Sequence, residues 1–500
     1  PAKGGNAAQK REHDKRIGAG TMSRSGAKCP CCGTIMTMED IRLEGKAGRL
    51  SQVMFTIVYA KEKGKDFRLP TNEEINTAQI SMTELSDLYN LIPSGLPQDN
   101  IIEDAKRSTW CVQYGFDEFG KLFTSRQLLA LGNLVILLKK LPSLIHEHGY
   151  ADEWVESITG YETCSLSRLL DYANCGAQWK LDANTINHSF VRNGIPISWD
   201  YAEGNIIGDS AGAFSLCYER ICTALDVFGM HGDIALPPSI FRQSSKKLPD
   251  AKYEIILTDP PYYDAISYAA MMDFFYVWLR RLLFGINKEY SLVYEPPLCP
   301  KWSEEENDGE LIDDANRFDG DRVKSKAAYE NGMTDVFLRC RNALDDNGRF
   351  VIVFANKQPD AWETMVAAII KSGFVVNGSW PIQTEQPSRM RAISSSALAS
   401  SVWIVCKKRP EDARPGWDNQ VLEEMRQNIK ERLREYWDAG IRGPDFVWAA
   451  TGPAMEAYSR HPIVKKANEP GPMTVNEFLT HVRRMVVDFV VGRVLSGDHE

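Results

Sequence analysis

The stretch Glu254-Ile255-Ile256-Leu257-Thr258-Asp259-Pro260-Pro261-Tyr262 decides how we interpret this chain. Its first five residues are mostly apolar, which predicts a short buried strand of a parallel sheet. The segment from Ile266 to Leu283 then places aromatic and aliphatic residues at helical spacing and is followed by Gly285, which predicts a helix. The sequence therefore puts Asp-Pro-Pro-Tyr at the carboxyl end of a strand, just before a helix.

The groups of this motif suit the binding of an amine. A carboxylate and a proline carbonyl can both accept hydrogen bonds from one exocyclic amino group, and donating both protons frees the nitrogen lone pair to attack an electrophilic methyl group. The tyrosine offers a face on which an extruded base can stack. The two prolines fix the backbone before the base arrives. The alternative is a plain proline turn that leaves a strand.

Length and composition set the broad class. The 500 residues, 43% of them hydrophobic, are enough for two or three domains with their own cores. The most apolar stretch, Leu128 to Leu138, is too short to span a membrane, so we expect no membrane segment. Eleven cysteines without a disulfide-like framework indicate a reducing cytoplasm. The chain begins with Pro1, so we expect it to be part of a longer protein.

The net charge of −9 does not itself indicate a nucleic-acid-binding protein, but basic residues are grouped along the chain. Arg389 and Arg391 fall in a long polar loop, Ile382 to Ser400, between two expected strands. We predict that they hold phosphates of a nucleic acid.

Cys29-Pro30-Cys31-Cys32-Gly33 has the form of a knuckle, in which Cys29 and Cys32 would face one metal ion. A structural zinc site needs four ligands, and no second cysteine pair follows at the expected spacing. The other pair would lie upstream of Pro1, on another chain, or nowhere. The alternative is a pair of reduced surface thiols.

Two other segments are candidates for binding a cofactor. Residues Ser198 to Asn205 combine aromatic, acidic and amide groups, and Asp200 and Asn205 are candidate ligands; a plain strand-to-helix connection is the alternative. Asp233 precedes the strand of the central motif and could bond the adenine amino group of a cofactor, or it could be a turn aspartate.

The order of elements after the motif predicts an α/β fold. A helix at Asp335 to Leu344, a strand, a second helix and two final strands, Phe374 to Pro381 and Ser401 to Lys407, match the second half of a Rossmann-like methyltransferase with an antiparallel last pair. Earlier in the chain we expect a strand at Gln52 to Tyr59 and an amphipathic helix from about Arg126 to Lys140, capped at Thr124 or Ser125. We expect five parts: a flexible basic arm at 1–28, half a zinc ribbon and a strand at 29–60, a helical insertion at 61–197, the methyltransferase core at 198–410, and a helical carboxyl-terminal domain at 411–500.

Residues Thr258 to Arg281, TDPPYYDAISYAAMMDFFYVWLRR, resemble a family of bacterial and archaeal adenine-specific DNA methylases that carry an internal zinc ribbon and often occur near phage-defence genes. The likeness covers most of the chain. It extends over 29–33, 44–49, 122–131, 199–205, 354–357, 379–382, 397–408 and 437–443.

The resemblance implies transfer of a methyl group from S-adenosylmethionine to the exocyclic amine of adenine in DNA. Asp259 and Pro260 would then hold the amine, Tyr262 would stack on the flipped base with Tyr263 beside it, and Asp233 would contact the cofactor together with Asp259. Asn356 stands where the family more often has histidine.

The sequence also departs from the family pattern, because these 500 residues lack the glycine-rich turn that follows the first strand and holds the cofactor's amino-acid end. In the family this turn lies upstream of the knuckle. We therefore expect an upstream region or a second chain to complete both the cofactor site and the zinc ribbon. Two alternatives stay open: a non-catalytic nucleic-acid-binding or assembly subunit that keeps the fold, and methylation of cytosine or RNA.

Overall fold

The computed structural model describes residues 12, 20–23, 25–104, 108–191, 194–230, 236, 238–248, 251–264, 266–356, 358–383, 400–441 and 444–495. The protein is a mixed α/β structure, 48% helix and 15% strand, with a mixed sheet. The chain forms two compact units: unit 1 comprises Pro1–Pro237 and Tyr268–Pro300, and unit 2 comprises Pro238–Ser267 and Lys301–Glu500.

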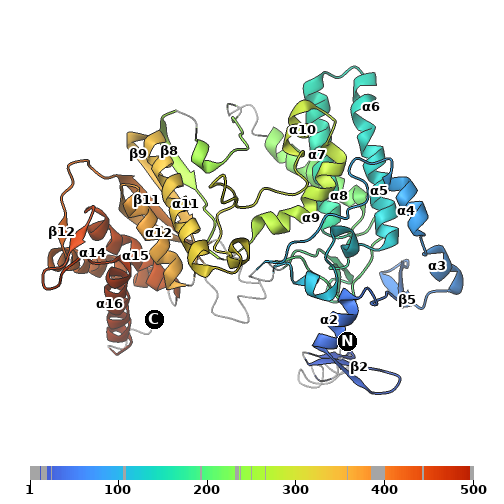
Figure 1. Cartoon of the computed structure of the whole chain (residues 1–500), viewed down its shortest axis with the longest axis horizontal. Helices are drawn as coiled ribbons and strands as arrows, with labels where there is room; N and C mark the ends of the chain where they lie inside the picture. The colour runs from blue at the N-terminus through green and yellow to red at the C-terminus, as the bar shows by residue number, and fades with distance from the viewer. Residues whose placement is uncertain are drawn as a thin grey trace. The chain divides into compact units, whose positions relative to one another are not determined.

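Unit 1 is mainly helical, with small two- and three-stranded sheets (Figure 1). Its strands are β1 Met22–Ser23, β2 Gly26–Lys28, β3 Ile35–Thr37, β4 Ile57–Ala60, β5 Lys65–Arg68, β6 Gln178–Lys180 and β7 Thr185–Asn187. Its helices are α2 Met38–Lys46, α3 Asn72–Thr77, α4 Met82–Tyr89, η1 Trp110–Tyr114, η2 Phe119–Leu122, α5 Ser125–Lys139, α6 Leu141–Glu147, α7 Asp152–Leu170, α8 Phe214–Gly229, α9 Tyr268–Leu283 and α10 Lys288–Val293.

The core of unit 1 forms where α4, α5, α7 and α9 pack together. The expected helix after the central motif is α9, and Trp278 on it is fully buried beside the Phe123 ring. The helix predicted from about Arg126 starts one residue earlier, because Thr124 caps it and shares a reciprocal capping box with Gln127. Arg126 forms an ion pair with Glu203, so this helix start is accounted for by its cap and pairing.

One helical stretch among the described residues, Ser125–Glu147, is long and apolar enough to cross a membrane by length and composition, with a mean hydropathy of 1.7. It consists of α5 and α6. Leu131 and Val135 of α5 are fully buried in the core of unit 1, and Lys139 donates from its Nζ to two backbone carbonyls of the α9 end. One face of α5 therefore packs in the core of unit 1, and 28% of the apolar window is buried.

Unit 2 is built on a four-stranded sheet in the order β10-β11-β9-β8, with helices packed on it (Figure 1). Its strands are β8 Tyr253–Thr258, β9 Leu344–Phe354, β10 Phe374–Gln383, β11 Ser400–Lys408, β12 Gly416–Trp417 and β13 Val464–Lys465. Its helices are η3 Ser245–Lys247, η4 Ala315–Phe318, α11 Arg322–Ala343, α12 Pro359–Lys371, α14 Asp418–Asp438, α15 Pro444–Ser459 and α16 Val475–Leu495.

The pairing of the strands agrees with the expected topology. β8 runs parallel to β9, while β9 and β11, and β11 and β10, are antiparallel. The predicted final pair of antiparallel strands is thus confirmed. Helices α14, α15 and α16, which we expected as a separate domain at 411–500, share one hydrophobic core with this sheet and belong to the same compact unit.

The expectation that β8 is a buried strand is wrong for one of its faces. Ile256 packs against the core, but Ile255 and Leu257, which point the opposite way, are exposed. Within the described residues β8 is an edge strand paired with β9 alone, and its outward side chains stay exposed.

The centre of the sheet is held by aromatic packing. The ring centroid of Phe350 on β9 lies 4.7 Å from that of Phe374 on β10 and 5.2 Å from that of Phe337 on α11. We expect Phe350→Ala to lower the free energy of unfolding of unit 2 by about 3–5 kcal/mol, because it leaves a cavity under three elements. Urea denaturation checks this, with Leu338→Ala on the exposed side of α11 as the control. Equal effects of the two substitutions would contradict it.

Candidate active site

The Asp-Pro-Pro-Tyr motif forms a corner at the carboxyl end of β8. The strand ends at Thr258, whose hydroxyl donates to the Val351 carbonyl of β9. Asp259 is exposed, and Pro260, Pro261 and Tyr262 are half-buried. The corner thus presents its carboxylate to solvent while its apolar parts rest on the core of unit 2.

The backbone immediately after the corner adopts an unusual conformation. Tyr263 has φ of +64°, in the left-handed region that large side chains rarely adopt. Such a conformation costs about 1–3 kcal/mol and persists only where the surroundings over-determine it. Here the Tyr263 N–H donates to the Pro261 carbonyl at 2.9 Å, and the Tyr263 carbonyl accepts from the Asp313 N–H at 3.2 Å. The reversal of the chain is therefore held from both sides.

Tyr329 of α11 anchors the same turn from beneath. Its hydroxyl donates to the Pro261 carbonyl at 2.7 Å and accepts from the Tyr263 N–H at 3.2 Å. Burial raises the pKa of the Tyr329 hydroxyl, so it stays protonated and available as a donor. The tyrosine is fully buried, so these two contacts are made away from water.

Asn356 holds the corner from the end of the neighbouring strand β9. Its Nδ2 donates to the Tyr262 carbonyl at 3.0 Å, and its Oδ1 accepts from the Gln358 N–H at 2.8 Å. The Trp362 indole N–H donates to the backbone carbonyl of Asn356 at 2.9 Å. Asn356, which stands where the family more often has histidine, therefore holds the backbone of the motif in position.

These contacts divide the acceptors of the corner into two groups. The carbonyls of Pro261 and Tyr262 are occupied by Tyr329, Tyr263 and Asn356. Among the described residues, no hydrogen bond or ion pair is made by the Asp259 carboxylate or the Pro260 carbonyl. The two acceptors that remain available among the described residues are therefore the two that the family resemblance implies for an amino group.

The two tyrosines of the motif have different surroundings. The Tyr262 ring is half-buried and meets Phe354 edge-to-face, with centroids 5.6 Å apart. Tyr263 was predicted to contact substrate, but it is only 6% exposed and its ring packs edge-on against Tyr329 at 5.2 Å. Burial raises the pKa of the Tyr263 hydroxyl, with Asp313 contributing. The structure thus places Tyr263 as a support of the corner.

Sequence reasoning missed Tyr329 and did not assign a role to Asn356. Tyr329 lies 68 residues from the carbonyl that it binds, in a helix whose apolar pattern gives no sign of a polar contact. Asn356 follows the apolar end of β9, and a polar residue at the carboxyl end of a strand next to the motif strand was the available signal.

The other predicted cofactor and substrate residues lie in unit 1 or outside the described residues, whereas the Asp259 corner belongs to unit 2. Asp200 and Asn205 lie in an exposed loop of unit 1, where the Asp200 carboxylate accepts from the Ser198 hydroxyl and the Asn205 side chain accepts from the Ile207 N–H. These local bonds are typical of a connecting loop. Asp233, Arg389 and Arg391 lie outside the described residues.

The predicted knuckle forms a tight turn between β2 and β3. The Gly33 N–H donates to the Cys29 carbonyl at 2.9 Å, and Gly33 has φ of +75°, which a side chain would disfavour. The Thr34 hydroxyl, 3.3 Å from the Cys32 sulfur, and then the Thr34 backbone and Cys29 lower the pKa of Cys32 to about 7. Two thiols on one turn fit half of a tetrahedral zinc site. No cluster of three or more metal-binding side chains occurs within the part of the chain that the structure describes.

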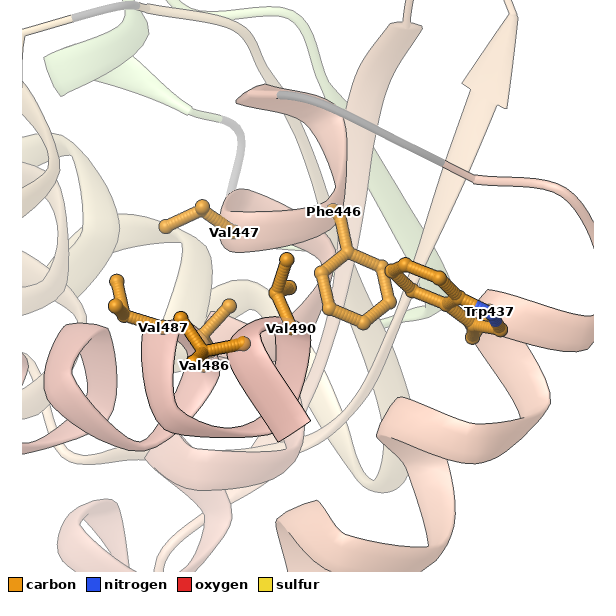
Figure 2. A pocket seen from close by; sticks show the side chains of 7 residues that line it. Trp437, Phe446, Val447, Val486, Val487 and Val490 are labelled. Atoms are coloured by element: carbon orange, nitrogen blue, oxygen red, sulfur yellow. The ribbon is translucent and has the colours of Figure 1, made fainter. Parts of the chain in front are cut away.

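A cavity of about 300 Å³ lies elsewhere in unit 2, between α14, α15 and α16 (Figure 2). Its lining consists of Trp437, Phe446, Val447, Val486, Val487, Val490 and Val491. Because it contains no titratable side chain, it offers no group for acid–base or nucleophilic chemistry. The Asp259 corner is therefore the better candidate for an active site.

Comparisons with known proteins add no independent assignment, because no family model, no curated protein and no solved structure matches this chain. The candidate site consequently depends on the geometry of its own residues.

We expect Tyr329→Phe to lower the free energy of unfolding of unit 2 by about 1–3 kcal/mol, because the buried Pro261 carbonyl loses its hydroxyl donor. Urea denaturation followed by tyrosine and tryptophan fluorescence measures it. Tyr253→Phe on the exposed side of β8 is the matched control and should change stability by less than about 0.5 kcal/mol. Indistinguishable curves for the two variants would show that the anchor does not exist.

The thiol of Cys32 should react with iodoacetamide at a rate that rises through about pH 7, because the thiolate is the nucleophile and prevails above its lowered pKa. In Thr34→Val the midpoint should move upwards, towards that of an ordinary thiol. Peptide mass spectrometry at a series of pH values gives the profile. A midpoint above about pH 8.5 in the unsubstituted protein would contradict the assigned interaction.

Proposed function

We propose that this chain is the catalytic part of an S-adenosylmethionine-dependent methyltransferase that modifies the exocyclic amine of adenine in DNA. The observation that carries the proposal is the pair of available acceptors, the Asp259 carboxylate and the Pro260 carbonyl, on a corner whose other carbonyls are occupied. An amino group carries two N–H donors, and these two acceptors match them.

Asp259 and Pro260 would act on the amine by polarising it. Both N–H bonds point at acceptors, so the lone pair turns out of conjugation with the ring and becomes nucleophilic. S-adenosylmethionine would supply the methyl group directly to this nitrogen, and the proton that the amine loses would pass through the Asp259 carboxylate to water. No covalent enzyme intermediate is needed, which agrees with a corner that contains no cysteine or serine nucleophile.

The half-buried ring of Tyr262 would supply the stacking surface for a base taken out of the helix. Phe354 holds its edge, so the ring is oriented before the base arrives. The arrangement of strands is also in keeping with the proposed Rossmann-like core, since β8 and β9 are parallel and the last two strands are antiparallel.

The described residues do not offer the glycine-rich turn that would hold the amino-acid end of the cofactor. We assign that turn to a segment beyond this chain, so methyl transfer is expected from the assembled protein. This same absence favours the second candidate function, a non-catalytic assembly subunit that keeps the fold. Isothermal titration with S-adenosylmethionine separates the two: binding by the assembly and not by this chain fits a divided site, and binding by neither fits the assembly subunit.

We expect Asp259→Ala to reduce incorporation of labelled methyl groups into DNA by about 100-fold or more, because it removes one of the two acceptors for the amine. The assay uses the assembled protein, tritiated S-adenosylmethionine and genomic DNA free of methyladenine. Asp346→Asn, at the opposite end of β9 and 97% exposed in its side chain, is the control and should keep most of the activity. Retained methylation in Asp259→Ala would refute the assigned role.

A further inference from the structure

The segment from Glu310 to Arg317, which is rich in acidic residues, contacts the Asp259 corner although it lies far along the chain from it. The Asp313 N–H donates to the Tyr263 carbonyl at 3.2 Å, immediately after the motif. Leu311 packs against the hydrophobic core of unit 2, and Ile312 is buried. The segment is thus anchored in the same unit as the corner and holds the residue that follows it.

The same segment also holds the chain a few residues beyond the corner. The Arg317 guanidinium donates to the Ser267 hydroxyl at 3.1 Å and to the Glu310 carboxylate at 2.5 Å. Ser267 is fully buried, and the side chains of Arg317 and Glu310 are only 11% and 13% exposed. Two points on the chain that leaves the motif, Tyr263 and Ser267, are therefore bound to one segment.

The side chain of Asp313 contacts both α11 and Tyr263. The Ser325 hydroxyl donates to its Oδ1, and Ser325 is fully buried in the first turn of α11. Burial raises the pKa of the Tyr263 hydroxyl, and the Asp313 carboxylate raises it further by its charge and by accepting a hydrogen bond from this hydroxyl. Asp313 thus holds Tyr263 at two places, its backbone carbonyl and its phenol.

Tyr263 depends on these contacts because its φ of +64° is unfavourable for a residue with a large side chain. Tyr329 holds the N–H side of this residue, and Asp313 holds its carbonyl side. If either contact is lost, the turn can relax, and the peptide groups before it rotate with it. The directions of the Asp259 carboxylate and the Pro260 carbonyl therefore depend on how Tyr263 is held.

We propose that Asp313 is a positioning residue for the corner and that it acts through Tyr263. By holding the carbonyl and the phenol of Tyr263, it keeps the acceptors of Asp259 and Pro260 directed at one amino group. The inference deepens the proposed function and rests on it, because it concerns the amine that the two acceptors would bind. Recognition of the amine should depend on Asp313, whereas stacking of the purine on Tyr262 should not.

The test compares two ligands, adenosine and purine riboside, which differ only in the exocyclic amino group. The ratio of their dissociation constants for this chain, measured by titrations followed by NMR, reports the contribution of that group. We expect the unsubstituted chain to prefer adenosine by about tenfold or more, because two hydrogen bonds form and one of them has a charged acceptor. Neither ligand carries a methyl group to be transferred, so the result does not depend on the cofactor site.

Asp313→Ala should reduce the preference for adenosine to about threefold or less, because hydrogen bonds weaken steeply when their acceptors are misaligned. The dissociation constant of purine riboside should stay within about twofold of its original value. Tyr263→Phe removes the phenol that Asp313 holds and should lower the preference to a similar extent. The double substitution should add little to either single one, because the two residues act through one contact.

Glu305→Ala is the matched control, since it removes an exposed carboxylate upstream in the same connection and should keep the preference. Circular dichroism and urea denaturation show whether each variant folds. If Asp313→Ala does not fold, Tyr263→Phe decides the question, because it leaves every backbone hydrogen bond of the turn in place.

The two ligands separate failure of this inference from failure of the proposed function. No preference for adenosine in the unsubstituted chain would contradict the proposed function and overturn the inference with it. A preference that Asp313→Ala and Tyr263→Phe leave intact would overturn the inference alone. An equal loss of affinity for both ligands would also overturn it, because Asp313 would then stabilise the fold of the site without directing its acceptors.

Discussion

The candidate site depends on which backbone carbonyls of the Asp259–Tyr263 turn are already hydrogen-bonded to the protein. Tyr329 and Asn356 occupy the carbonyls of Pro261 and Tyr262, while the left-handed conformation of Tyr263 reverses the chain. Each bond contributes only about 0.5–1.5 kcal/mol net, yet together they hold a strained backbone in one shape. Asp259 and Pro260 are therefore held in place, while the Asp259 carboxylate and the Pro260 carbonyl make no hydrogen bond to the described part of the protein. A site that must bind an amino group through two acceptors needs this division.

The sheet poses a second constraint, because its two sides differ. Aromatic packing of Phe337, Phe350 and Phe374 stabilises one face, whereas Ile255 and Leu257 on the other side of β8 are exposed. The candidate corner stands at the carboxyl end of β8, which is an edge strand of the described sheet.

Much of the order of elements could be predicted from local patterns. The strand before Asp259, the capped start of α5, the helix α9 and the antiparallel pair β10 and β11 all follow from periodicity, caps and turn residues. The boundaries were less accurate: a strand expected from Gln52 starts only at Ile57, and α11, expected from Asp335, starts at Arg322. The first turns of α11 were not predicted because their residues are mostly polar and form no apolar stripe. Capping by the Asp321 side chain stabilises this end of the helix.

The sequence could predict the acceptor residues of the candidate site, Asp259 and Pro260, but it could not predict Tyr329, which holds their backbone in place. Asp259 and Pro260 form a contiguous motif, so their proximity is a local property of the chain. The contact of Tyr329 with Pro261 joins residues far apart in sequence, and only the packing of α11 under the sheet brings them together. The same limit explains β8: its apolar run predicts burial, but whether a partner covers it depends on elements that a local pattern does not contain.

The central claim is that the Asp259–Pro260 corner grips the amino group of adenine, and a crystal structure of the assembled protein with bound adenosine tests it most directly. The account predicts the exocyclic nitrogen within hydrogen-bond distance of both the Asp259 carboxylate and the Pro260 carbonyl, with the purine against the Tyr262 ring. Adenosine bound with its amino group directed elsewhere, or an Asp259 carboxylate engaged by the protein itself, would contradict it.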